Sequence, residues 1–270
     1  MSANPQEAAS TEQILSEKTG SIGWIIFNRP ERHNAVSYEM WTAIPKMLDA
    51  FEADEEVRIV ILKGNGGRAF VSGADISQFE EKRSSEEATK IYNAATDAAT
   101  TRLSLFSKPT IAMIDGYCIG GGCSIAISCD FRIASAKSTF AIPAAKLGLG
   151  YAFAGVRKLM DLVGPSYTKE IFYSARQFSA EEAHMMGLVN RVVPEDELND
   201  YVGSFASRIA VNAPMTIHAV KVSVEEGLKD PEQRDASRVD KLIADCFASS
   251  DYQEGRKAFM EKRPPEFRGR

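Results

Sequence analysis

Short apolar runs alternate with amphipathic stretches through the first two thirds of the chain. The runs typical of buried β-strands cover residues 21–30, 57–64, 110–116, 131–135 and 138–142. Between the first two, residues 37–56 have helical spacing, set by Met40, Ile44, Met47, Leu48 and Phe51. Ser37 precedes this pattern as a predicted N-cap. Strands that alternate with helices predict an α/β core whose sheet is buried on both faces.

From about residue 154 onward the pattern becomes almost entirely helical. Ser179 and Glu182 have the spacing of a capping box, and Gly164 and Gly187 are predicted to follow helix ends. We therefore expect three parts. These are a polar N-terminal tail at 1–12, an α/β core at 13–190 and a helical C-terminal region at 191–270.

Composition and charge exclude several classes of protein. The 270 residues carry a formal net charge of −5, which argues against a nucleic-acid binder because phosphate neutralisation needs clustered basic residues. No apolar run approaches the length of a membrane-spanning helix. The polar first residues lack the features of a secretory signal, and the four cysteines lack metal-ligand spacing. We expect a cytoplasmic protein without a metal.

Two segments combine a preceding apolar strand with small residues where a helix is expected to begin. They are VSGADI (71–76) and DGYCIGGGCSIAI (115–127). A helix N-terminus offers N–H groups without intrahelical partners, and two such groups aimed at one oxygen form an oxyanion hole. Close packing of helix against strand would explain the same glycines. The residues alone leave both interpretations open.

Together with NRPERHNAV (28–36) and the tail SSDYQEGRKAFMEKRPPEF (249–267), these segments resemble the crotonase (enoyl-CoA hydratase/isomerase) superfamily. The resemblance covers residues 15–268, with the elements in the family's order. It implies a ββα spiral core, a helical C-terminal trimerisation region and acyl-thioester chemistry. It further implies a homo-oligomer, a trimer or a dimer of trimers, with no cofactor beyond the coenzyme A of the substrate.

The resemblance also assigns roles to residues. The N–H groups of Ala74 and Gly121 would form the oxyanion hole, and Gly120 and Gly122 would let the thioester approach the backbone. The positions that match the path of coenzyme A are Arg32, His33, Ala35, Ser72, Asp75, Ile76, Phe259 and Lys262. Without the resemblance, we would interpret Lys262 as an ordinary surface lysine.

At two positions the sequence departs from the hydratase pattern. Hydratases of the superfamily carry a glutamate two residues after the glycine triplet and another just after the following proline. Here those positions hold Ser124 and Ala144. Neither side chain is a general base near neutral pH, and a positioned base typically contributes about 10²–10⁴-fold to a rate.

Tyr151 occupies a position at which the methylmalonyl-CoA decarboxylase branch has a tyrosine, and the tail is also similar to that branch. Decarboxylation needs an oxyanion hole and a group that holds the carboxylate, but no base for water. Tyr151 is also compatible with a simple packing role. Lys146 could hold the carboxylate, although a solvated surface lysine is the interpretation we favour.

Three functions are consistent with these residues. The first is an enoyl-CoA hydratase/isomerase-type enzyme, the second a decarboxylase using Tyr151, and the third a catalytically silent acyl-CoA-binding protein. We rank the first ahead because most members of the superfamily fall in that group.

Overall fold

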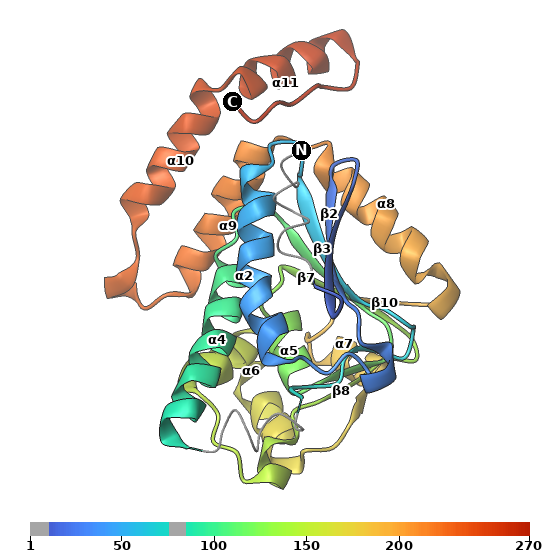
Figure 1. Ribbon diagram of the computed structural model, residues 1–270. Coiled ribbons are helices and arrows are strands. Elements are labelled where there is room, and N and C mark those ends of the chain that lie inside the picture. Colours follow the sequence, from blue (N-terminus) through green and yellow to red (C-terminus); the bar gives the residue numbers. More distant parts are fainter. Residues whose placement is uncertain (1–10, 76–84) are drawn as a thin grey trace.

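A computed structural model describes residues 11–75 and 85–270 of the chain (Figure 1). Its larger sheet has six strands in the order β1-β2-β3-β5-β7-β10. Their bounds are β1 Ile14–Thr19, β2 Ile22–Phe27, β3 Ile59–Gly64, β5 Thr110–Ile114, β7 Phe131–Ser135 and β10 Arg191–Val193. The first two strands form an antiparallel hairpin, and each later pairing is parallel.

A smaller sheet continues from the larger one, in the order β4-β6-β8-β9. Its strands are β4 Ala69–Val71, β6 Tyr117–Ile119, β8 Thr139–Ala141 and β9 Phe178–Ser179. Strands β3, β5 and β7 of the large sheet each lead directly into β4, β6 and β8 of the small one, and a helical segment follows each pair in sequence. These repeated ββα units confirm the predicted spiral core.

The large sheet is buried on both faces, as its continuous apolar strands predict. Helices α2 (Tyr38–Ala53) and α4 (Glu86–Ser104) cover one face, and α8 (Leu198–Ala210) covers the other. Along β3, Val60 and Leu62 join the cluster that contains α2, whereas Ile59 and Ile61 pack against α8. Residues 191–210 thus add a strand and a helix to the core.

The remaining helices follow the strands in sequence. They are α5 Gly121–Ala126, α6 Phe153–Ser174, α7 Ala180–Met185, α9 Pro214–Leu228, α10 Ala236–Ala248 and α11 Ser250–Glu261. Short 3₁₀ turns occupy η1 Pro30–Arg32, η3 Pro143–Leu147, η4 Glu195–Glu197 and η5 Pro231–Gln233. No helix in the described ranges is long and apolar enough to cross a membrane.

Several local predictions are confirmed at the level of single residues. The Ser37 hydroxyl accepts a hydrogen bond from the Met40 N–H at 3.3 Å and caps α2. Ser179 and Glu182 form the predicted capping box of α7. Gly187 adopts a positive φ of 84° directly after this helix. Gly164 also has a positive φ, but helix resumes at once, so it forms a kink inside α6 instead of an end.

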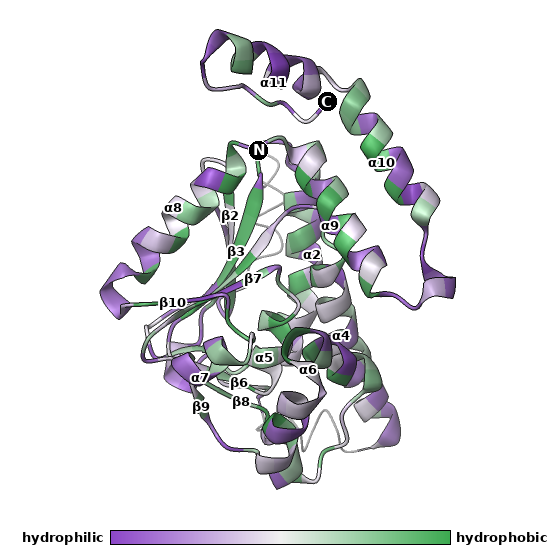
Figure 2. Cartoon of the chain, turned by 180° about the vertical axis from the view of Figure 1, so that it is seen from behind, coloured by the Kyte–Doolittle hydropathy of each residue, from purple (hydrophilic) through white to green (hydrophobic). Residues whose placement is uncertain are grey.

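Helices α10 and α11 extend away from the body of the molecule (Figure 1). We call residues 236–270 the C-terminal arm. No residue of α10 is buried, and apolar positions alternate with polar ones along it (Figure 2). The last residues fold back on α11, where the N–H groups of Arg268 and Gly269 donate to the buried carboxylate of Asp251. Within the one chain, the arm therefore leaves an apolar surface uncovered.

Candidate active site

The two predicted backbone donors lie next to each other. Gly121 opens α5 directly after β6, and Ala74 follows β4 in an extended segment that pairs with Val36. A Cβ built on Gly121 would lie 3.5 Å from the Ala74 nitrogen and 3.1 Å from the ring of Trp41. Ala74 itself lies in the bridge to Val36, and the helix expected after it would cover residues 76–84, which lie outside the described residues.

Both N–H groups lack an acceptor among the described residues. In the bridge to Val36, the Val36 N–H donates to the Gly73 carbonyl at 2.9 Å and the Asp75 N–H donates to the Val36 carbonyl at 3.0 Å. The Ala74 N–H takes no part in this bridge. The Gly120 N–H donates to the Ala141 carbonyl at 2.8 Å, whereas the next N–H, that of Gly121, is the first of α5 and has no intrahelical partner. Two unpaired donors therefore sit side by side.

Each glycine of the GGG triplet is required for a different reason. Gly120 has φ 53° and ψ −110°, which a residue with a side chain rarely adopts. Gly121 leaves open the space beside the Ala74 nitrogen. At Gly122 a Cβ would lie 2.3 Å from the Val71 carbonyl, so only glycine lets α5 approach β4 this closely.

The segment carrying Ala74 is held by a largely buried ion pair. Arg29 contacts the Asp75 carboxylate at 2.8 Å and also donates to the Ala35 carbonyl at 2.8 Å. Asn34, fully buried with a φ of 55°, donates to the Ala69 carbonyl at 2.7 Å. The 29–36 loop and the 69–75 segment are thereby locked together. Asp75, predicted to line the substrate path, is buried and engaged in this pair.

The two positions that depart from the hydratase pattern differ in their surroundings. Ser124 is half-buried on α5, and its hydroxyl oxygen lies 2.7 Å from that of Tyr151. Tyr151 packs edge-on against Phe172 at a ring distance of 4.8 Å. Burial raises the pKa of Tyr151 above its usual value, although the Ser124 hydrogen bond lowers it in part. The Tyr151 hydroxyl is therefore protonated at neutral pH.

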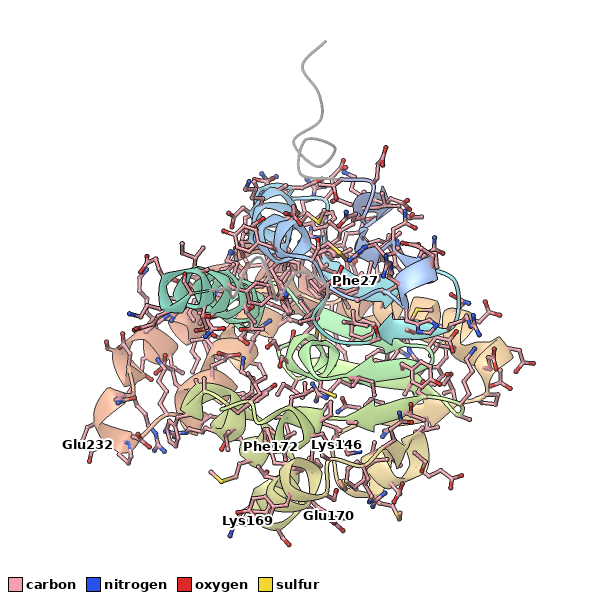
Figure 3. All side chains as sticks on the ribbon, turned by 60° about the horizontal axis from the view of Figure 1, so that its bottom comes forward. Phe27, Lys146, Lys169, Glu170, Phe172 and Glu232 are labelled. Atoms are coloured by element: carbon pink, nitrogen blue, oxygen red, sulfur yellow. The ribbon has the colours of Figure 1, made fainter. Side chains whose placement is uncertain are left out.

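Ala144 and Lys146 lie on the 3₁₀ turn η3, which precedes Tyr151. Ala144 is buried in the main core, and its carbonyl accepts a hydrogen bond from the Leu149 N–H at 3.0 Å. Lys146 is exposed at the end of the molecule that faces the viewer in Figure 3, which also labels Phe172 there. Ala144 thus offers no group for chemistry, while Lys146 extends into solvent.

The predicted coenzyme A residues divide into two groups. Arg32 and His33 are exposed on the η1 loop, and the Ser72 N–H donates to the His33 carbonyl at 3.1 Å, so this loop, Ala35 and Ser72 lie close to Ala74. Ile76 falls outside the described residues. Phe259 and Lys262 lie on the arm, at the end of the molecule opposite α5 (Figures 1 and 2), and Phe259 is 83% exposed. The single chain does not bring this second group to the site.

The sequence analysis missed Trp41 as a residue of the site. Its ring packs beside Gly121, and its Nε1–H donates to the Tyr92 hydroxyl at 3.1 Å across α2 and α4. The sequence pattern predicts Trp41 only as one of several apolar residues of an amphipathic helix. Arg29 was missed for a similar reason, because nothing in the sequence pairs it with Asp75.

Comparison with known proteins agrees with this arrangement. The sequence model of the enoyl-CoA hydratase/isomerase family matches residues 17–270. The chain belongs to the enoyl-CoA hydratase/isomerase family. It is thus related to enzymes that process acyl-CoA.

Individual members of the enoyl-CoA hydratase/isomerase family align over nearly the whole chain. The crotonyl-CoA hydratase of Syntrophomonas wolfei is 35% identical over 95% of this chain and 98% of its own length. The short-chain-enoyl-CoA hydratase of Clostridium acetobutylicum is 34% identical, over 94% and 96%. A crystal structure of an enoyl-CoA hydratase/carnithine racemase from Magnetospirillum magneticum superposes with a TM-score of 0.92 at 32% identity, covering 97% of each chain. The predicted fold class is confirmed.

Proposed function

We propose that the protein binds an acyl-CoA thioester and stabilises its enolate through the N–H groups of Ala74 and Gly121. The observation that carries this proposal is the adjacency of these two donors, neither of which has an acceptor among the described residues. Fixed donors aimed at an oxygen that becomes negative lower the barrier because they need no reorganisation during the reaction. Removing one such donor typically costs about 10²–10³-fold in rate.

The nucleotide part of the thioester is proposed to lie along the η1 loop. Arg32 and His33 are exposed there, next to Ser72, and basic side chains suit a phosphate-rich ligand. The Arg29–Asp75 ion pair would act indirectly by keeping this loop and Ala74 in register.

For the reaction itself, our first candidate is hydration or double-bond isomerisation of an enoyl-CoA, in line with the names of the related hydratases. The enolate formed at the oxyanion hole is common to both reactions. With Ser124 and Ala144 at the two glutamate positions of the hydratase pattern, the acid and base of this reaction must be other groups.

The Ser124–Tyr151 hydrogen bond favours a second candidate, decarboxylation of a methylmalonyl-type CoA thioester. The bond between the α-carbon and the carboxylate breaks, and its electron pair becomes the enolate held by Ala74 and Gly121. Carbon dioxide leaves, and a proton is then delivered to the α-carbon. A tyrosine that is protonated at neutral pH is suited to donate a hydrogen bond to the departing carboxylate, or to donate that proton.

We also propose that the chain assembles into a homo-oligomer through its arm. An apolar groove of about 810 Å³ lies between α9, α10 and α11, and Val220, Phe247 and Phe259 line it while more than half exposed. A second copy that covers this groove would bury them. Because Phe259 and Lys262 lie far from their own α5, they would reach the nucleotide of another copy if they bind one.

One panel of substrates distinguishes the candidate reactions from one another and from binding without catalysis. The purified protein is assayed with crotonyl-CoA, a longer enoyl-CoA and methylmalonyl-CoA, alongside a titration with coenzyme A. Turnover of an enoyl-CoA supports the first candidate. Release of carbon dioxide that is lost in Tyr151→Phe supports the second. Binding without turnover on every substrate identifies a silent acyl-CoA-binding protein, and absence of binding refutes the proposed function altogether.

A further inference from the structure

The carbonyl end of α5, opposite the Gly121 N–H, is held by a buried arginine. Arg132 lies on β7 and is only 3% exposed. Its Nη1 donates to the Cys129 carbonyl at 2.8 Å and to the Ala126 carbonyl at 3.4 Å. Its Nε donates to the Leu188 carbonyl at 2.7 Å. The guanidinium thus binds carbonyl groups of the last turn of α5 and of the turn after it, where the Ala126 carbonyl also accepts from the Cys129 N–H at 3.2 Å.

This arginine has no acidic partner among the residues that the structure describes, where no carboxylate oxygen lies within 4.0 Å of it. Its remaining side-chain contact is the neutral Asn190, at 3.3 Å from Nη2. A buried cation without a counter-ion is unfavourable unless dipoles compensate for its lost hydration. Here the hydrogen-bonding dipoles are backbone carbonyls, that of Ala126 in α5 included, and Asp130, paired with Lys221, acts on the guanidinium only at longer range. The charge of Arg132 is therefore coupled directly to this helix.

A lysine reaches the same helix through a serine. Lys158 on α6 is half-buried, and its Nζ donates to the hydroxyls of Ser104 and Ser128 at 2.6 and 3.1 Å. The Ser128 hydroxyl in turn donates to the Ser124 carbonyl at 2.8 Å. A second cation therefore faces the carbonyl end of α5 from a different element.

We propose that Arg132, and more weakly Lys158, are positioning residues for the thioester oxygen. They hold α5 by its carbonyl end and strengthen the attraction of the Gly121 N–H for the anionic form of that oxygen. The six residues of α5 are about 9 Å long and the hydrogen bond at their end adds about 3 Å, so the guanidinium lies roughly 12 Å from this N–H. At this range a charge in a protein changes an equilibrium on the order of tenfold. This inference rests on the proposed function.

The test uses butyryl-CoA labelled with ¹³C at the thioester carbonyl, because its infrared stretch reports how strongly the bound carbonyl is polarised, whatever the reaction. In Arg132→Gln an amide replaces the charge. We expect this variant to lose a large part of the shift in carbonyl frequency that the wild type causes on binding. We also expect it to turn over the substrate that the wild type converts about tenfold more slowly, mainly through kcat. Arg132→Lys, which keeps the charge, should retain most of the shift.

Lys108→Met is the matched control. Lys108 is also a half-buried cation at a helix end, donating to the Phe51 and Asp54 carbonyls at the end of α2, but it does not contact α5. Its loss should leave the bound carbonyl frequency unchanged. If Arg132→Gln does not fold, Lys158→Gln replaces it, with a smaller shift expected in the same direction.

An unchanged carbonyl frequency in whichever charge-removing variant folds would overturn the inference. So would an equal change in Lys108→Met, because the effect would then be one of general stability. If instead the wild type binds no butyryl-CoA, or leaves its carbonyl frequency as in water, the proposed function itself has failed.

Discussion

Helices α2 and α10 are both amphipathic, yet α2 is packed in the core and α10 is exposed. α2 buries seven of its 16 residues against the large sheet and α4. α10 has 13 residues and buries none of them, and its Ile243 and Phe247 side chains line the groove shared with α9. An apolar stripe indicates that a helix needs a partner, but not whether that partner belongs to the same chain. The predicted site shows the same division, because its backbone donors lie in the core and two of its predicted ligand contacts lie on the arm.

The largest expected effect is on stability, from Trp41→Ala. Trp41 is 1% exposed, between α4 and the start of α5, so we expect a loss of about 3–5 kcal/mol in the free energy of unfolding. The matched change on the arm, Phe247→Ala, should cost under about 1 kcal/mol in the dissociated chain, because Phe247 is 62% exposed. Urea unfolding of both variants measures the contrast, and equal losses would contradict it.

Gly121→Ala should act mainly on catalysis, with a smaller cost in stability because the added methyl would lie 3.1 Å from the Trp41 ring. The added methyl would lie beside the Ala74 nitrogen, where the thioester oxygen is proposed to bind, so we expect turnover to fall about 10²–10³-fold. Gly203→Ala on α8 is the control, since a Cβ there meets nothing within 4 Å. Steady-state rates of the two variants are compared, and an active Gly121→Ala enzyme would argue against the oxyanion hole.

Tyr151 distinguishes the two candidate reactions by pH as well as by substitution. Because burial raises its pKa, the protonated hydroxyl persists above the usual tyrosine range near pH 10. The rate of a step that needs this proton should therefore not change around neutral pH because of Tyr151. It should fall only above about pH 10, where the tyrosine begins to lose its proton. Tyr151→Phe should slow decarboxylation about 100-fold. An unaltered rate of carbon dioxide release in this variant would exclude the role.

Phe247→Asp should have the smallest effect on the stability of the folded core. A charge in the apolar groove of the arm should dissociate the proposed oligomer, and light scattering after size-exclusion chromatography measures this. We also expect KM for acyl-CoA to rise several-fold, because Phe259 and Lys262 would lose the site of the neighbouring copy. Met185→Asp on α7, 74% exposed and outside the arm, is the control. A monomeric wild type would refute the proposal.

The sequence predicts those parts of the structure that depend on neighbouring residues. The bounds of β7, the Ser37 cap and the capping box of α7 are local, and each is found as expected. The GGG triplet is predictive for the same reason, because a positive φ and the close approach of two backbone segments both require glycine.

The contacts that the sequence does not predict join residues distant along the chain. The Arg29–Asp75 pair, the Trp41–Tyr92 hydrogen bond and the contact of Trp41 with Gly121 all depend on how the ββα units stack. The Ser124–Tyr151 hydrogen bond spans 27 residues, and no pattern in the sequence links the two hydroxyls. The sequence also does not predict what covers the apolar side of the arm, where Phe247 and Phe259 remain exposed in the described chain.

The central claim is that Ala74 and Gly121 bind one thioester oxygen between them. A crystal structure of the protein with butyryl-CoA tests this directly. We predict that the thioester oxygen lies within about 2.7–3.1 Å of both backbone nitrogens. A bound thioester whose oxygen contacts neither nitrogen, with the acyl group held elsewhere on the molecule, would contradict the account.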